Sequence, residues 1–338
     1  MKKFGFLALL GAFATAANAQ FVDGDLVVGV QGTTLDASLF AMDKTTGAAG
    51  FNVGLTGFRF AASGNGGSIK GDIDGTLYLG GVATAGGTTG RVGKVTMAGT
   101  LTQAITPALI RSVASTGTGS FFISQSSGGF FSAASLVFDN STTNTVTNIF
   151  TSAARGVGSW GGDGYVVRAS GGATTTGVFN GAGATNQVAS VTTPATTGPN
   201  DMAISWDGLT MYLTDERTTA GTGGVIKYTR GTTSSNFVQQ YILSTDTDGV
   251  GTLATGAKFL AVSYDSGGQA TIFASTSETS DNRIVKIIDT GAGATGVTLS
   301  NAGAGNIYKG VGLVPEPASF AVLGLGLLGL AARRRRTK

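Results

Sequence analysis

The sequence of 338 residues contains no cysteine and no histidine, and only 12% of its residues are charged. Without cysteine there are no disulfides, thiol nucleophiles or iron–sulfur clusters. Without histidine there is no imidazole base, no Ser-His-Asp triad and none of the usual zinc or copper sites. These absences predict a protein without a cofactor or a metal and without catalytic activity. The apolar fraction of 41% is nevertheless sufficient for a folded core.

The formal net charge of +3 arises from the two ends of the chain. Seven of the 22 Lys and Arg residues are Lys2, Lys3 and the basic residues of segment 333–338. Between residues 20 and 314 there are 15 basic and 18 acidic residues, without a run of like charge. Because nucleic-acid binding requires a stripe of basic residues, we expect no nucleic-acid partner.

The first 19 residues have the order of features typical of an export signal. Lys2 and Lys3 precede an apolar block at 4–13, and the small residues Ala17 and Ala19 follow it. Small residues at these two positions are the pattern that signal peptidase recognises. The sequence therefore predicts a signal peptide at 1–19, cleaved after Ala19.

The C-terminal segment 315–338 also combines three features. Pro315, Glu316 and Pro317 form an extended motif, because proline disfavours helix at its own position and at the preceding residue. An apolar block follows at 318–332, long enough for about 22 Å of helix. A basic cluster then ends the chain, and the positive-inside rule predicts that it stays on the cytoplasmic side. It consists of Arg333, Arg334, Arg335 and Arg336, followed by Thr337 and Lys338.

This order of motif, apolar block and Arg cluster resembles the PEP-CTERM sorting signal of Gram-negative bacteria. The resemblance implies that Pro315, Glu316 and Pro317 are recognised by an exosortase, and that Arg333 to Arg336 act as the stop-transfer cluster. It also implies that the exported protein is held transiently in the inner membrane. The resemblance further implies delivery, after processing, to the cell surface or to extracellular polysaccharide. The alternative is an ordinary single-pass tail anchor.

The body, residues 20–314, repeats a pattern of short apolar runs separated by glycine turns. Five first hairpins are predicted around turn glycines spaced 44 to 48 residues apart, and a second hairpin follows each. These glycines are Gly75, Gly119, Gly164, Gly208 and Gly256. Four short strands in a repeat of this length are typical of a β-propeller blade. The alternatives are tandem β-sandwiches or an irregular glycine-rich sheet.

The two ends of the body complete the pattern. Residues 24–31 read as the second strand of a blade and 37–55 as its outer hairpin, but no first strand precedes them. Near the other end, 307–315 reads as a first strand without a continuation. We therefore predict an all-β fold, a propeller of six four-stranded blades, with one blade closed by pairing of the N- and C-terminal segments. The signal peptide and the C-terminal apolar helix lie outside this fold.

Several side chains in the body are candidates for function. Asp215, Glu216 and Arg217 form its densest charge cluster and end a predicted strand, beside Asp207 in the same hairpin. Paired carboxylates can catalyse glycoside hydrolysis at a suitable separation, but neighbouring residues on a turn usually point apart. These residues carry the alternative prediction, a secreted enzyme acting on a sugar, a lactone or an ester.

Other candidates are the Asp-Gly turns and the two tryptophans. The turns could hold calcium, although in the third of them the acidic residue of an EF-hand loop is replaced by Ala257. The turns are Asp23-Gly24-Asp25, Asp72 to Gly75, and Asp246 to Gly249. Trp160 and Trp206 could bind sugars, but packing between blades is the simpler interpretation. The leading prediction is an exported, non-enzymatic module that binds exopolysaccharide or surface partners, with a self-assembling surface coat as a further alternative.

Overall fold

The computed structural model describes residues 21–314 except 33–35, 62–65, 73, 85, 118, 126–129, 152–153, 170–175, 181–185, 191–197, 219–222 and 248–255. Several predicted features lie outside the described residues. These are the signal peptide 1–19 with Ala17 and Ala19, the sorting signal 315–338 with Pro315, Glu316, Pro317 and Arg333 to Arg336, and Asp248 and Gly249 of one candidate calcium turn.

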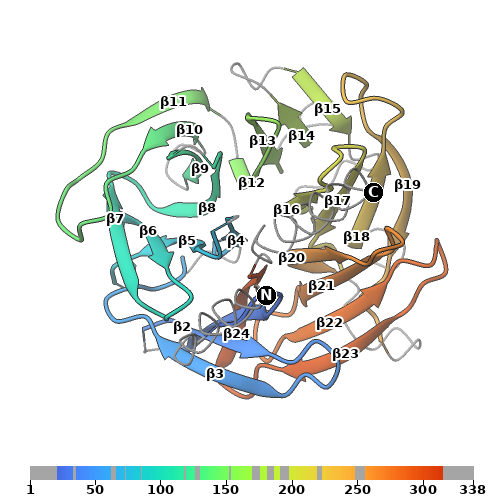
Figure 1. The fold of residues 1–338 in the computed structure, drawn as a ribbon, viewed down its shortest axis with the longest axis horizontal. Coiled ribbons are helices and arrows are strands. Elements are labelled where there is room, and N and C mark those ends of the chain that lie inside the picture. The colour runs from blue at the N-terminus through green and yellow to red at the C-terminus, as the bar shows by residue number, and fades with distance from the viewer. Residues whose placement is uncertain are drawn as a thin grey trace, which may run out of the picture.

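The described residues form six four-stranded antiparallel sheets arranged as blades around one axis (Figure 1), which confirms the predicted propeller. Blade 1 consists of β24 (Asn306–Leu313), β1 (Leu26–Gly32), β2 (Ser38–Met42) and β3 (Ala49–Gly54). Blade 2 consists of β4 (Ile69–Gly71), β5 (Leu77–Val82), β6 (Gly90–Val95) and β7 (Leu101–Thr106). Blade 3 consists of β8 (Ile110–Ser115), β9 (Ser120–Gln125), β10 (Phe130–Ser135) and β11 (Val146–Thr151).

The other three blades follow in chain order. Blade 4 consists of β12 (Ala154–Trp160), β13 (Asp163–Arg168), β14 (Gly177–Asn180) and β15 (Asn186–Ser190). Blade 5 consists of β16 (Pro199–Ile204), β17 (Thr210–Asp215), β18 (Gly224–Thr229) and β19 (Val238–Leu243). Blade 6 consists of β20 (Ala257–Tyr264), β21 (Ala270–Thr276), β22 (Arg283–Ile288) and β23 (Gly296–Asn301). No helix is found in the described part of the chain.

The ring closes where the sequence predicts. In blade 1 the last strand, β24, pairs antiparallel with the first, β1, from Leu26 opposite Leu313 to Gly32 opposite Asn306. Gly310 lets β24 approach the next blade closely, since a Cβ there would lie 2.1 Å from the carbonyl oxygen of Gly67. Closure within one sheet leaves no open seam, so the ring is complete within residues 26–313.

Two of the five predicted turn glycines are wrong. Gly164 lies inside β13, and the turn before it is made by Gly161 and Gly162. Gly256 precedes β20, which runs for eight residues, so the turn of that hairpin comes later, at 265–269. Its geometry is set by the Asp265 carboxylate, which accepts backbone hydrogen bonds within the turn. Both errors have the same cause, because glycine is common enough here to occur beside turns as well as in them.

The hydrophobic core lies between the blades. Six buried clusters each join residues of two neighbouring blades. In β1, Val27 packs toward blade 2 whereas Leu26 and Val28 pack toward blade 6, as the two-residue period of a strand requires. Since both faces of such a strand are buried, its sequence is a continuous apolar run.

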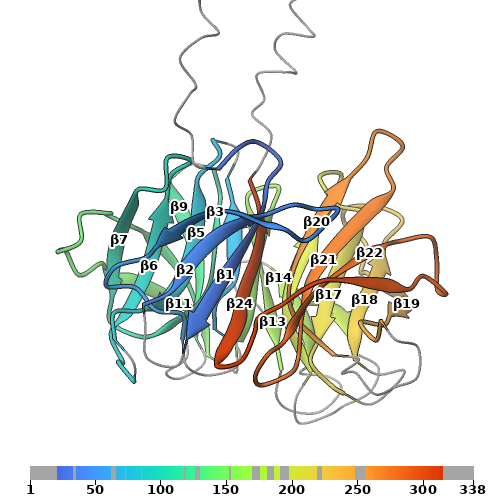
Figure 2. The ribbon, with the colours of Figure 1, turned by 90° about the horizontal axis from the view of Figure 1, so that it is seen from below.

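Figure 2 shows the ring from the side, with its two ends at the top and the bottom of the view. The strand of each blade that lies nearest the centre of the ring is called its inner strand; these are β24, β4, β8, β12, β16 and β20. All inner strands begin at one end of the ring, here called the mouth end. They finish at the other end, here called the tether end. At the tether end β24 stops at Leu313, and the backbone of Val314 bonds that of Gly24 and Asp25. Phe21 and Val314 are both buried in one cluster. Both ends of the described chain therefore leave the ring at the tether end.

Candidate functional site

The inner strands surround the centre of the ring, where all six contribute to the lining of one cavity. Each inner strand carries one charged residue within its bounds. Five are basic and one is acidic, which gives the inner strands a formal charge of +4. They are Lys70, Arg111, Arg155, Asp201, Lys258 and Lys309. Opposite charge dominates the connections at the tether end, where nine aspartates face only Lys44 and Arg230. The inner strands and the tether-end connections therefore carry net charges of opposite sign, although the total charge of the body is small.

A β-bulge near the start of the inner strand positions the charged residue in five blades. The pairing register shifts around Arg111, Arg155, Asp201 and Lys258, and in blade 1 around Lys309. A bulge leaves a residue outside the ladder and changes the direction of its side chain. The repeated bulge thus places charge at the same level of each of these blades, near the mouth end.

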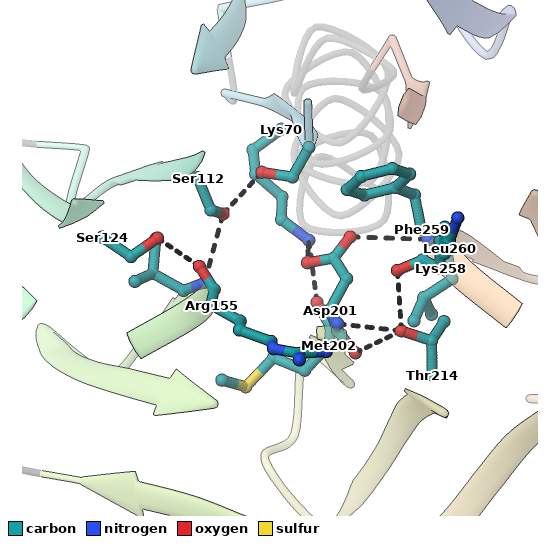
Figure 3. A network of polar contacts seen from close by, with 12 residues as sticks. Lys70, Ser112, Ser124, Arg155, Asp201, Met202, Thr214, Lys258, Phe259 and Leu260 are labelled. Atoms are coloured by element: carbon teal, nitrogen blue, oxygen red, sulfur yellow. Dashed lines mark hydrogen bonds and ion pairs between the residues drawn. The ribbon is translucent and has the colours of Figure 1, made fainter. Parts of the chain in front are cut away.

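The acidic member of this set is neutralised from across the channel (Figure 3). The Lys70 Nζ, from blade 2, lies 2.8 Å from the Asp201 Oδ1 and 2.8 Å from the carbonyl oxygen of Met202, in the opposite blade 5. The Asp201 side chain is completely buried, and its second oxygen accepts a 3.4 Å bond from the backbone of Leu260. This ion pair joins two opposite blades, and Asp201 is the one acidic residue within the bounds of the six inner strands.

Hydroxyl groups hold the bulges of neighbouring blades together around this level. The Ser124 hydroxyl donates to the carbonyl of Arg155, and the Thr214 hydroxyl donates to the carbonyl of Lys258 at 2.9 Å. The Ser112 hydroxyl accepts a bond from the backbone of Val157 at 3.1 Å. Because each bond crosses between two blades, the backbones that carry the basic residues are fixed relative to one another.

The charge cluster singled out from the sequence lies at the mouth end, with each carboxylate held by an arginine. The buried Asp215 accepts bonds from Arg217 Nε at 2.9 Å and Nη2 at 2.7 Å. Burial raises the pKa of Asp215, and the Arg217 guanidinium opposes that shift. Glu216 pairs with Arg155 Nη1 at 2.5 Å. Asp207 lies at the other end of the hairpin, where it accepts from Ser205, so the predicted neighbourhood of Asp207 and Asp215 is wrong. The reason is that β17 separates them by its full length.

Two of the inner-strand lysines have no ion-pair partner among the described residues. Lys258 and Lys309 are 6% and 5% exposed, and neither ammonium makes a hydrogen bond or ion pair with a described residue. Burial lowers the pKa of Lys258, with Glu216 and Glu278 acting against that shift. Burial also lowers the pKa of Lys309, to about 8, and the charge of Lys258 adds to the effect. Two buried ammonium groups that repel each other favour an anion between or beside them.

Other buried polar atoms at the mouth end are also without partners. Both side-chain atoms of Asn200, next to Asp201, are buried without a hydrogen bond, as are Ser277 Oγ and Glu278 Oε2. Buried polar atoms are normally hydrogen-bonded, and exceptions indicate a site that a ligand or water completes. Their position agrees with a ligand site at the mouth end of the channel.

The two tryptophans lie at the tether end. Trp160 packs between blades 4 and 5: its Nε1 donates to the carbonyl of Trp206 at 3.0 Å, and a Cβ on Gly208 would lie 2.3 Å from its ring. Gly208 also has a φ of 72°, so the turn requires glycine for two reasons. Packing between blades is thus confirmed for Trp160. Trp206 is 85% exposed and does not pack there.

Of the candidate calcium turns, Asp72 to Gly75 lies between β4 and β5, Asp23 to Asp25 precedes β1, and Asp246 lies between blades 5 and 6. Asp25 and Asp74 accept hydrogen bonds from the nearby backbone of Val22 and Thr76. Within the described ranges, acidic side chains do not gather in groups of three or more that could hold a metal ion. The same ranges contain no helix of the length and apolarity that a membrane span needs.

Sequence reasoning missed the channel cations because they are far apart in the chain. Arg111, Arg155, Lys258 and Lys309 come from four different blades. The signal that could have found them is the repeat itself, since one charged residue stands at an equivalent place in successive first strands. The density of charge along the chain instead indicated Asp215 and Glu216 as candidate site residues.

A comparison with protein-family models identifies the C-terminal segment. The PEP-CTERM protein-sorting motif matches residues 313–336. The match begins inside β24, so the motif follows the ring without a linker. No curated protein matches the chain.

Solved structures with similar folds have little sequence identity to this chain. A chain of a nidogen–laminin complex aligns with a TM-score of 0.59 at 9% identity, covering 87% of this chain and 100% of that one. A protein of unknown function from Bacteroides caccae gives 0.54 at 12%, with the same coverages. A putative 6-phosphogluconolactonase from Bacteroides uniformis gives 0.51 at 16%, covering 82% of each chain. At these identities the likeness shows the propeller fold alone.

Proposed function

We propose that this exported protein, which carries a PEP-CTERM sorting motif and is processed by an exosortase at the membrane, is a non-enzymatic binding module for anionic exopolysaccharide. Its ligand site is the mouth end of the propeller channel. In this proposal, signal peptidase removes the leader, and the apolar block 318–332 holds the protein in the inner membrane until processing. The product then resides at the surface or in the matrix of a Gram-negative cell, as in a biofilm.

The observation that carries the proposal is the charge of the inner strands. The six inner strands have a formal charge of +4 in a body with more acidic than basic residues. Burying unpaired ammonium groups costs stability, which a bound anion would restore. Polymers of acidic sugars supply such anions, and a ring of cations attracts them at long range.

The direction of the tether supports the same site. Because the motif follows β24 directly, the tether end of the ring lies nearest the membrane before processing. From Val314 to the apolar block at 318 the chain can span only about 14 Å, even if fully extended. The mouth end then points away from the membrane and toward extracellular polymer. The acidic tether-end connections face the lipid surface and disfavour its use as a binding face for anionic polymer.

The experiment is a binding measurement with residues 20–314, which contain the complete ring. We expect retention on immobilised acidic polysaccharide, such as alginate, and none on a neutral polymer such as dextran. The affinity should fall as salt rises, because surface ion pairs are screened over about 10 Å at 0.1 M ionic strength. Equal retention on both polymers, or no retention on either, would refute the proposal.

A further inference from the structure

A cavity of about 320 Å³ opens at the mouth end between blades 1, 2 and 6. Its wall is formed by the end of β1, the start of β24, the segment before β4 and the β21–β22 connection. A volume near 300 Å³ is at the lower end of the range for small-molecule sites. The cavity is therefore large enough for a single small ligand or for one unit of a polymer.

Two basic side chains line this cavity, and none of its described lining residues is acidic. Lys309 is one of the two buried inner-strand lysines that have no ion-pair partner among the described residues. Arg59 is 9% exposed, and its backbone is fixed by a two-bond bridge to Val82, at 2.8 Å each way. Its guanidinium donates to the carbonyl of Gly32 at 3.4 Å. The electrostatics of the cavity thus select an anionic group.

The remaining polar lining suits a hydroxylated ligand. The side chains of Thr279, Ser280 and Asn306 make no hydrogen bond to a described residue, so their hydroxyl and amide groups are available. Phe60 adds apolar surface, and its backbone is held by Gln31 through a 3.1 Å bond to Oε1. Two cationic side chains beside several neutral donors and acceptors, with one apolar wall, form the lining that an acidic sugar requires.

We propose that this cavity binds one uronic acid unit, with its carboxylate held by Lys309 and Arg59 and its hydroxyls facing Thr279, Ser280 and Asn306. Arginine is well suited to a carboxylate because its planar guanidinium can form two parallel hydrogen bonds with it. This inference rests on the proposed function and deepens it, since it places one unit of the polymer at one part of the mouth.

The test is isothermal titration calorimetry on residues 20–314 with sodium glucuronate, a glucuronate trimer, glucose and inorganic phosphate. Two variants alter the cavity: Lys309→Met removes its unpaired cation, and Asn306→Asp adds a negative charge with little change of shape. Lys44→Met, in a tether-end turn, is the matched control. Circular dichroism on each variant shows that its ring is intact.

We expect glucuronate and its trimer to bind and glucose to give no measurable heat. Lys309→Met and Asn306→Asp should each weaken glucuronate binding by about tenfold or more, which corresponds to a charged hydrogen bond. Lys44→Met should leave it unchanged. The inference is overturned if both cavity variants bind glucuronate as the parent does, or if phosphate binds as well as glucuronate.

The two proposals fail separately. If alginate is retained while glucuronate affinity does not respond to either cavity variant, the cavity assignment is wrong and the proposed function stands. If glucuronate binds in the cavity but no acidic polymer is retained, the proposed function is wrong and the cavity is a site for free acidic sugars.

Discussion

Replacement of Lys309 by methionine is expected to stabilise the fold at neutral pH. The pKa of the buried Lys309 is about 8, below the ordinary value of 10.5, because burial and the charge of Lys258 disfavour its protonated form. A shift of one pKa unit corresponds to about 1.4 kcal/mol, so the protonated side chain costs the folded state about 3 kcal/mol. Methionine fills a similar volume without the charge and removes this cost.

The pH dependence identifies the cause of the stabilisation. Since the folded pKa lies below the unfolded one, the unfolded chain binds more protons between pH 8 and 10.5, and the parent gains stability over this range. The penalty is fully present below pH 8 and is nearly gone at pH 11. The variant should therefore be more stable by about 3 kcal/mol at pH 7, and by much less at pH 11.

Guanidinium unfolding curves of the parent and the variant at both pH values measure this difference. Lys44→Met controls for removal of a partly exposed lysine and should change the free energy of unfolding by less than about 0.5 kcal/mol. A Lys309→Met variant that is less stable than the parent at pH 7, or equally stabilised at both pH values, would refute the reasoning. If it is stabilised and also loses glucuronate affinity, the protein retains Lys309 for binding at the expense of stability.

The other predictions concern the ring and its ion pairs. Gly310→Ala should lower the free energy of unfolding by about 1 to 3 kcal/mol through overpacking against blade 2, whereas Gly54→Ala, which meets nothing within 4 Å, should be nearly neutral in urea titrations. Lys70→Met should lower the free energy of unfolding by about 3 to 5 kcal/mol, because it leaves Asp201 buried without its cation. Adding Asp201→Asn to this variant should recover much of the loss. A double-mutant cycle without coupling would contradict the ion pair between Lys70 and Asp201. Asp289→Asn should destabilise at pH 7, because the carboxylate binds a lysine and two tyrosine hydroxyls that lower its pKa, and this difference should shrink as the pH falls below about 4; a constant difference across pH would show that the carboxylate's charge is not involved.

The architecture could be predicted from sequence because its determinants are local and repeated. Each hairpin is marked in the sequence by two apolar runs and a glycine turn. The incomplete units at 24–31 and 307–315 predicted the pairing of β1 with β24. The misplaced turns at Gly164 and Gly256 are exceptions to this local pattern. There the strand ends are set by pairing with a neighbour and by an aspartate turn, which glycine spacing alone does not report.

The candidate site could not be predicted in the same way. Lys309 and Arg59 are 250 positions apart in the sequence and meet only because the ring closes. Local charge density pointed instead to Asp215 and Glu216, whose carboxylates are each held by an arginine. A comparison of equivalent positions between repeats would have revealed one charge per inner strand, but the bulge that directs each side chain depends on strand pairing.

A crystal structure of residues 20–314 soaked with the glucuronate trimer tests the central claim most directly. The account predicts sugar density at the mouth end, with one carboxylate within hydrogen-bonding distance of Lys309 Nζ and the Arg59 guanidinium. Density confined to the tether end, near the exposed Trp206, or a trimer bound at the mouth with its carboxylates directed away from both cations, would contradict it.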